Sequence, residues 1–158
     1  MIKKNEEKKI KYKIRLMNKN DYDEVFNLWK TIKGFAIRKI DDEKAGVVKF
    51  INKNKTTCVV AIVGKEIIGS ILCGNDGRQA YFYHVCVRKD MRKHGIASSM
   101  VLYLIKKLKK LNVNKISLVA FKNNNIGNKF WKTIGFSFRN DMNVYEKVLN
   151  KNYSVVFN

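Results

Sequence analysis

The sequence predicts a mixed α/β domain, with helices on both faces of one sheet, in the order β-α-α-β-β-β-α-β-α-β-β. Runs rich in β-branched and aromatic residues alternate with segments whose apolar residues have helical spacing. The runs at 57–63 and 67–73 are separated by three residues, which is typical of an antiparallel hairpin. A strand at 81–87 leads through a basic turn into a long amphipathic helix from Ile96.

The N-terminal half begins with a charged segment and then shows strand and helix patterns in turn. The first helix is indicated by an apolar stripe of Tyr22, Val25, Phe26, Trp29 and Ile32, after an Asn or Asp that can cap it. We expect, in order, a basic tail, a strand, a helix, a loop, a second helix and the two hairpin strands, at residues 1–11, 12–17, 20–33, 34–40, 41–53, 57–63 and 67–73.

The C-terminal half continues the alternation after the long helix. We expect a strand at 115–121, a helix at 126–134, and two last strands at 136–138 and 144–149. Residues 150–158 are expected to form either a loose tail or an edge strand. Because no repeat or linker is visible, residues 12–149 are assigned to one domain.

Composition narrows the class of protein. No run approaches the roughly eighteen apolar residues of a membrane span, and the N-terminus lacks the apolar core of a signal peptide. We therefore expect a cytoplasmic protein. The formal net charge of +20 raises a nucleic-acid hypothesis. The lysines are spread along the chain, so we favour a general lysine bias with attraction for an anionic ligand.

The cysteines carry no metal or disulfide signal. Cys58, Cys73 and Cys86 lie in apolar runs, their number is odd, and no C-x-x-C occurs. Their expected role is that of small buried side chains, and no metal is expected. Cys86 has the better claim to a functional role, because it lies just before the basic turn.

The turn at Arg92–Ala97, R-K-H-G-I-A, is the clearest ligand site in the sequence. Backbone N–H groups in the first turn of a helix lack intrahelical partners, and the helix dipole adds positive charge there. A phosphate fits such a site, and Gly95 leaves room for its approach. Arg92, Lys93 and His94 add donors and charge. The segment matches neither G-x-G-x-x-G nor the Walker sequence, which disfavours dinucleotide and ATP sites.

Two motifs in this order resemble the signatures of the GCN5-related N-acetyltransferase (GNAT) family. The first, [Q/R]-x-x-G-x-[G/A], is carried by Arg92, Gly95 and Ala97. The second, N-x-x-[A/G]-x-x-[F/L]-[Y/W]-x-x-x-G-F, is carried by Asn124–Phe136. The middle of the chain also resembles an uncharacterised bacterial subgroup. The resemblance covers residues 12–149 in topology, and implies a mostly antiparallel GNAT-like sheet of six to seven strands.

The family resemblance implies acetyl-CoA as cosubstrate, without a metal. The loop amides hold the CoA pyrophosphate, and the preceding strand pairs with the pantetheine arm. The implied cofactor-binding residues are Val85, Cys86, Val87, Arg92, Lys93, His94, Gly95, Ile96, Ala97, Asn124 and Trp131. The family often has tyrosine, an acid for the leaving thiolate, where this chain has Trp131. Indole cannot give up its N–H proton in this way, so we expect Trp131 to pack against pantetheine or core, and water or a nearby tyrosine to supply the proton.

The implied reaction is direct attack of a primary amine on acetyl-CoA in a ternary complex. Tyr83 and His84 are the candidate catalytic residues. A histidine pKa of about 6.5 suits a base, but His84 is also interpretable as a structural side chain. Tyr83 is a candidate for proton relay or substrate contact. Strand alternation separates Tyr81, Tyr83, Val85 and Val87 from Phe82, His84 and Cys86, unless a bulge intervenes.

Three points stay open at this level. Asp41, Asp42 and Glu43 suit either a cationic amine or, as we favour, a helix N-terminus. The acceptor is a small amine, an amino sugar or antibiotic, or a protein amine, and a homodimer is one option for the assembly. The alternatives to an enzyme are a CoA-binding regulatory module without turnover and, less favoured, a basic nucleic-acid-binding protein.

Overall fold

The computed structural model describes residues 10–158. The expected N-terminal tail therefore lies outside the described residues except at positions 10 and 11. The strands are β1 (Lys13–Leu16), β2 (Ala36–Arg38), β3 (Val59–Val63), β4 (Glu66–Asn75), β5 (Gln79–Val87), β6 (Lys115–Ser117) and β7 (Val155–Phe157). The helices are α1 (Tyr22–Thr31), α2 (Lys44–Lys53), α3 (Ile96–Lys110) and α4 (Asn125–Thr133).

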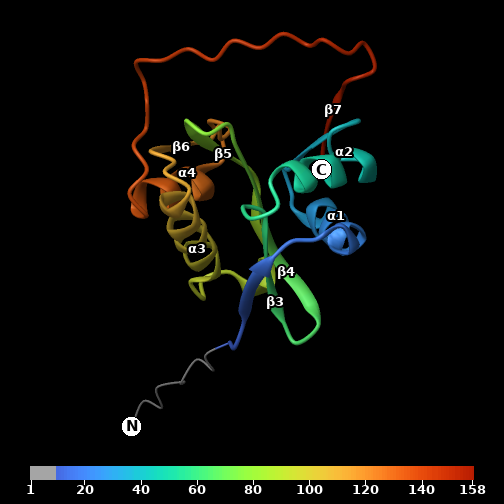
Figure 1. The fold of residues 1–158 in the computed structure, drawn as a ribbon, viewed down its shortest axis with the longest axis vertical. Helices are drawn as coiled ribbons and strands as arrows, with labels where there is room; N and C mark the ends of the chain where they lie inside the picture. Colours follow the sequence, from blue (N-terminus) through green and yellow to red (C-terminus); the bar gives the residue numbers. More distant parts are fainter. Residues whose placement is uncertain (1–9) are drawn as a thin grey trace.

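The main sheet has five strands in the order β1-β3-β4-β5-β6. Its pairs are antiparallel except for β5 and β6, which are parallel because α3 crosses between them. Helices α1 and α2 lie on one side of this sheet, and α3 and α4 lie on the other (Figure 1). The predicted fold class, a mostly antiparallel mixed sheet with helices on both faces, is confirmed.

Each face of the sheet has its own hydrophobic core. On the α3 side, Ile68 of β4 packs with Met100 and Leu104, which are fully buried. On the α1 and α2 side, the fully buried Trp29 is the largest member of the second core. In residues 114–158, all of which the structure describes, no side chain is buried, and Val113 is the last core residue along the chain.

A second, two-stranded sheet joins the two ends of the sequence. Strand β2 pairs antiparallel with β7, with Ala36 opposite Phe157. The backbone of Gly34 adds a hydrogen bond, its N–H donating to the carbonyl of Asn158 at 2.9 Å. The sequence was expected to form a loop at 34–40, so β2 was missed. It is too short for its pattern to be visible without its partner.

The two last expected strands, 136–138 and 144–149, are not formed. Residues 137–149 are irregular, and the chain arches from α4 to β7 across one end of the molecule (Figure 1). The side chains of Tyr145 and Leu149 are 88 % and 90 % exposed. The segment has strand-like residues, but a strand also needs a neighbour for its backbone, and none of the described residues supplies one. The seven strands therefore divide between two sheets.

The core on the α3 side predicts a contrast within one helix. Leu104→Ala removes a fully buried side chain and should lower the free energy of unfolding by about 2–5 kcal/mol. Leu102→Ala is the matched control, since Leu102 is 56 % exposed, and it should change stability by about 0.5 kcal/mol or less. Urea unfolding followed by circular dichroism measures both. Equal effects would contradict the assignment of the buried face.

Candidate active site

The centre of the site is a β-bulge in β5. Leu72 of β4 faces Tyr83 and Ser70 faces Cys86, so the single residue between them on β4 faces two on β5, His84 and Val85. His84 adopts a left-handed backbone, with φ of 49°. This extra residue shifts the alternation of side chains, which places Tyr83 and His84 on the same face of the sheet. The expected separation of these two residues therefore does not hold.

Beyond the bulge, β5 parts from β6. The parallel pairing of the two strands ends at Tyr81, opposite Ser117. Within the described chain, the stretch Val85–Val87 pairs with β4 alone, at Ser70 and Gly69, and its other edge is open toward the β6 side. An open strand edge presents backbone N–H and C=O groups that an extended ligand can pair with.

The basic turn after β5 is held in an open shape by two left-handed residues. Lys93 has φ of 66° and Gly95 has φ of 75°. A Cβ added at Gly95 would meet no atom within 4 Å, so this side of the loop is open space. The Arg92 side chain donates from Nε to the carbonyl of Val87 at 3.0 Å, which ties the loop to β5. Arg92 thus spends at least one of its donors within the protein.

The first turn of α3 is uncapped. Gly95 is the N-cap, no side chain of the described chain caps the helix, and its first turn contains no acidic residue. The N–H groups of Ile96, Ala97 and Ser98 therefore point out of a 15-residue helix without a charge to oppose the dipole. The helix start is fixed to the lead into β1 by a hydrogen bond of 2.7 Å between Tyr12 Oη and Ser99 Oγ. This is an anion site of the kind that helix N-termini provide.

His84 is held in the interior beside the bulge. Its Nε2 lies 2.6 Å from Oδ1 of Asp42, and both side chains are 5 % exposed. Its ring stacks on Trp29 and Phe35, with centroid distances of 4.4 Å and 4.8 Å. Asp42 also accepts from the backbone N–H of Arg38 at 2.6 Å. This placement favours the structural interpretation of His84 and leaves Asp42 engaged inside the protein.

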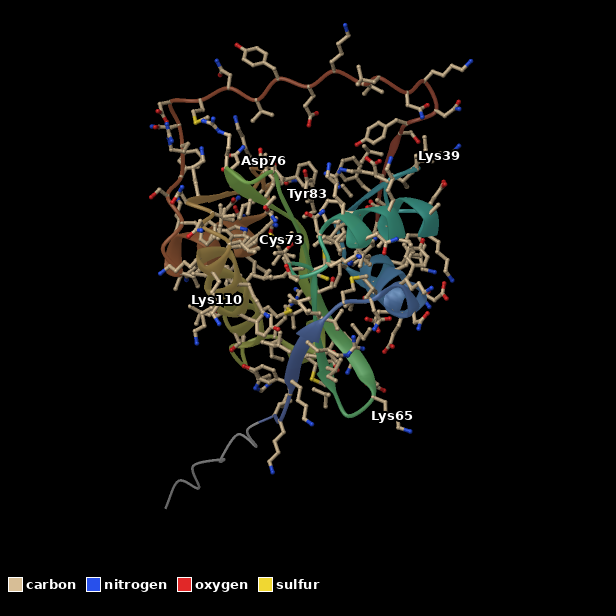
Figure 2. All side chains as sticks on the ribbon, viewed as in Figure 1. Lys39, Lys65, Cys73, Asp76, Tyr83 and Lys110 are labelled. Atoms are coloured by element: carbon tan, nitrogen blue, oxygen red, sulfur yellow. The ribbon has the colours of Figure 1, made fainter. Side chains whose placement is uncertain are left out.

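Tyr83 is placed differently, because its side chain reaches the surface. It is 39 % exposed and lies between the two halves of the molecule (Figure 2), next to Tyr81 at 4.7 Å and Phe50 at 5.6 Å between ring centroids. Burial raises the pKa of Tyr83 above its ordinary value, Arg38 opposes this rise, and Asp41 adds to it. The phenol therefore carries its proton at neutral pH and is suited to donate it.

The two predicted residues of α4 take structural positions. Asn124 is the N-cap, and its Oδ1 accepts from the N–H of Gly127 at 3.0 Å. The Trp131 ring lies 5.0 Å from those of Phe130 and Phe136, and 6.3 Å from Phe82 of β5. The structure therefore places Trp131 in an aromatic cluster between α4 and the sheet, in agreement with the packing role.

The three cysteines are free and buried. Burial raises the pKa of the Cys58, Cys73 and Cys86 thiols to about 11, 12 and 11. Cys86 contacts Ser70 Oγ at 3.5 Å, and Ser70 also accepts from Trp29 Nε1 at 2.9 Å. A thiol at such a pKa is not a nucleophile at neutral pH, so Cys86 contributes its backbone rather than its sulfur to this site. Within residues 10–158, no cluster of three His, Cys, Asp or Glu side chains is arranged to hold a metal.

Sequence reasoning missed the contacts that hold the bulge. Asp42 was assigned to a helix N-terminus, and Trp29 and Ser70 were not connected to the site. Asp42 and His84 are 42 positions apart, and Trp29 and Ser70 are 41 apart. The one signal was Ser70 itself, a hydroxyl inside an otherwise apolar strand, which needs a buried partner.

This geometry is matched by comparison with known proteins. The model of the acetyltransferase (GNAT) family matches residues 19–136. An acetyltransferase of Sodalis glossinidius (strain morsitans) is 32 % identical over 107 residues, which cover 68 % of this chain and 74 % of that protein. The chain therefore belongs to the GNAT acetyltransferase family, and by class it is an N-acetyltransferase.

Solved structures share the fold at low identity. The ribosomal-protein-alanine N-acetyltransferase from Brucella melitensis biovar Abortus has a TM-score of 0.68 and 19 % identity, covering 89 % of this chain and 100 % of its own. An acetyltransferase from Clostridium acetobutylicum, solved with acetyl-CoA, has a TM-score of 0.64 and 22 % identity, covering 86 % of this chain and 96 % of its own. None of the helices in the described part of the chain is long and apolar enough to span a membrane.

The His84–Asp42 contact predicts a coupled loss of stability. His84→Asn and Asp42→Ala should each cost about 1–3 kcal/mol, because each leaves a buried polar partner unpaired. The double variant should cost less than the sum, with a coupling of about 0.5–3 kcal/mol. Asp41→Ala, at the exposed neighbouring position, is the control and should be near neutral. Denaturant unfolding measures all four, and additive effects would show that the contact does not form.

Proposed function

We propose that this protein transfers the acetyl group of acetyl-CoA to a primary amine by direct attack in a ternary complex. The observation that carries the proposal is the uncapped N-terminus of α3 beside the open edge of β5. The N–H groups of Ile96, Ala97 and Ser98 would hold the pyrophosphate, with Lys93 and His94 next to it. The edge at Val85–Val87 would pair with the pantetheine arm. A family neighbour solved with acetyl-CoA supports this cosubstrate.

The chemical step follows from this placement. The lone pair of a neutral amine attacks the thioester carbonyl, and the oxyanion that develops is stabilised by a backbone N–H near the bulge. The intermediate collapses with loss of the CoA thiolate, and the proton of the former amine leaves to water. We assign the proton that the thiolate takes up to the Tyr83 phenol, whose raised pKa keeps it protonated. His84 is assigned a positioning role at the bulge.

The acceptor remains one of the three amine classes that the sequence left open. Residues around Tyr83 supply both charges, since Arg38 and Asp41 both influence its pKa. We infer that the acceptor enters from the α1 and α2 side of the sheet, where Tyr83 is exposed. A cytoplasmic location is part of the same proposal.

Gly95 offers a direct test of the cosubstrate site. Gly95→Glu should lower the affinity for acetyl-CoA by at least about a hundredfold, because it places a carboxylate where the diphosphate would lie. Gly95→Ala is the matched control: it meets no atom, and its left-handed backbone costs only about 1 kcal/mol of stability. Isothermal titration calorimetry measures both. Equal affinities for the Glu variant and wild type would refute the site.

Tyr83→Phe tests the proton assignment. The variant should lose roughly a hundredfold in kcat with an unchanged KM for acetyl-CoA, measured by thiol release. Because an acid works only while protonated and this pKa is raised, wild-type kcat should fall with rising pH only above about pH 10. His84→Gln should leave the shape of the pH profile unchanged. A profile altered by His84→Gln and not by Tyr83→Phe would reverse the two roles.

The two rival functions give different results in the same set of experiments. A regulatory module would bind acetyl-CoA without thiol release across a panel of small amines, amino sugars and peptide N-termini. A nucleic-acid-binding protein would bind RNA or DNA in a salt-sensitive manner that acetyl-CoA does not disturb. The charge of +20 motivates the latter control.

A further inference from the structure

The segment 137–149, called the arm from here on, exposes an unusual amount of apolar surface. Its large apolar side chains are 58–90 % exposed, namely Phe138, Met142, Val144, Tyr145, Val148 and Leu149. Scattered apolar residues are normal on a protein surface, but such a concentration in one segment marks an interaction site. The arm is therefore a candidate for contact with a second macromolecule.

The arm is held at both ends and crosses open space between them. At its start, the Phe136 ring packs 5.0 Å from Trp131. At its end, a turn joins Tyr153 N–H to the Asn150 carbonyl at 2.9 Å, and Ser154 accepts from Lys39 N–H at 2.8 Å. In between, the chain arches over the end of the molecule (Figure 1), and its side chains project to both sides (Figure 2).

The main sheet has an open edge that fits a segment of this kind. Strand β6 pairs with β5 on one side and is the last strand of the sheet on the other. The residues just after it are also exposed and apolar, with Val119 at 60 % and Phe121 at 45 %. An unpaired edge flanked by apolar side chains is a template for an added strand. Exposed Lys115 on β6 and Glu146 on the arm have opposite charges.

We propose that two copies of this chain form a dimer in which the arm of each copy adds as a strand along β6 of the other. The arm cannot reach the β6 of its own chain while β7 stays paired with β2, because the turn at 150–153 shortens the connection. A second copy meets no such restriction. The exchange is reciprocal, so the two arms and two edges are satisfied by one twofold axis.

The first experiment compares matched apolar positions. Wild type should sediment as a dimer, and Val148→Asp/Leu149→Asp should raise the dimer dissociation constant by at least about tenfold, because charge replaces apolar surface buried at the edge. Ile126→Asp is the control, since Ile126 is 76 % exposed but lies on α4, and it should leave the dimer intact. All these side chains are exposed, so circular dichroism should be unchanged. A monomeric wild type, or equal effects of both changes, would overturn the proposal.

The second experiment asks which chain the arm contacts. Lys115→Cys and Val148→Cys are made on separate, differently tagged chains that are co-expressed and treated with a short bismaleimide. The three native cysteines are buried and should not react. A cross-linked heterodimer is expected, whereas Lys65→Cys, at the far end of the β3–β4 hairpin (Figure 2), should give none with Val148→Cys. Cross-linking within one chain of a Lys115→Cys/Val148→Cys double variant, without the heterodimer, would exclude the exchange.

Discussion

The extra residue in β5 at His84 is the constraint on which the site depends. A bulge bends its strand, and β5 keeps β6 beside it up to Tyr81 and not beyond. The bulge is held by groups from three other parts of the chain. Asp42 receives the imidazole, Trp29 stacks on it, and Ser70 links Trp29 to the strand that faces the bulge. An unbulged β5 would continue along β6 and close the edge that the proposed pantetheine contact needs.

The parts of the fold that could be predicted are those specified by neighbours in sequence. The hairpin of β3 and β4, and the unit of β5, basic turn and α3, each follow from a pattern within about thirty residues. The pairing of β2 with β7 joins positions at opposite ends of the chain, such as Ala36 and Phe157, and no local pattern specifies it. The strands expected at 136–138 and 144–149 fail for the converse reason. Their residues favour strands, but no described strand lies beside them.

The candidate site divides in the same way. The phosphate loop was predicted from six consecutive residues, because a helix N-terminus and a glycine are local features. The face on which His84 lies was not, since a single inserted residue reverses every side chain after it. Arg92 was expected beside the phosphate, and the structure uses its Nε to fasten the loop to Val87. Such a contact depends on the fold of the loop and not on the motif.

The absence of buried side chains after Val113 gives the two halves of the molecule unequal internal cohesion. The half that contains α4 is joined to the sheet by partly exposed aromatic rings, so it can open locally at a lower free energy than the α3 core. A bound cosubstrate lying between β5 and this half would supply apolar contacts that the polypeptide itself does not provide. By mass action, acetyl-CoA would then serve as a missing piece of the protein's interior, ordering its least stable region.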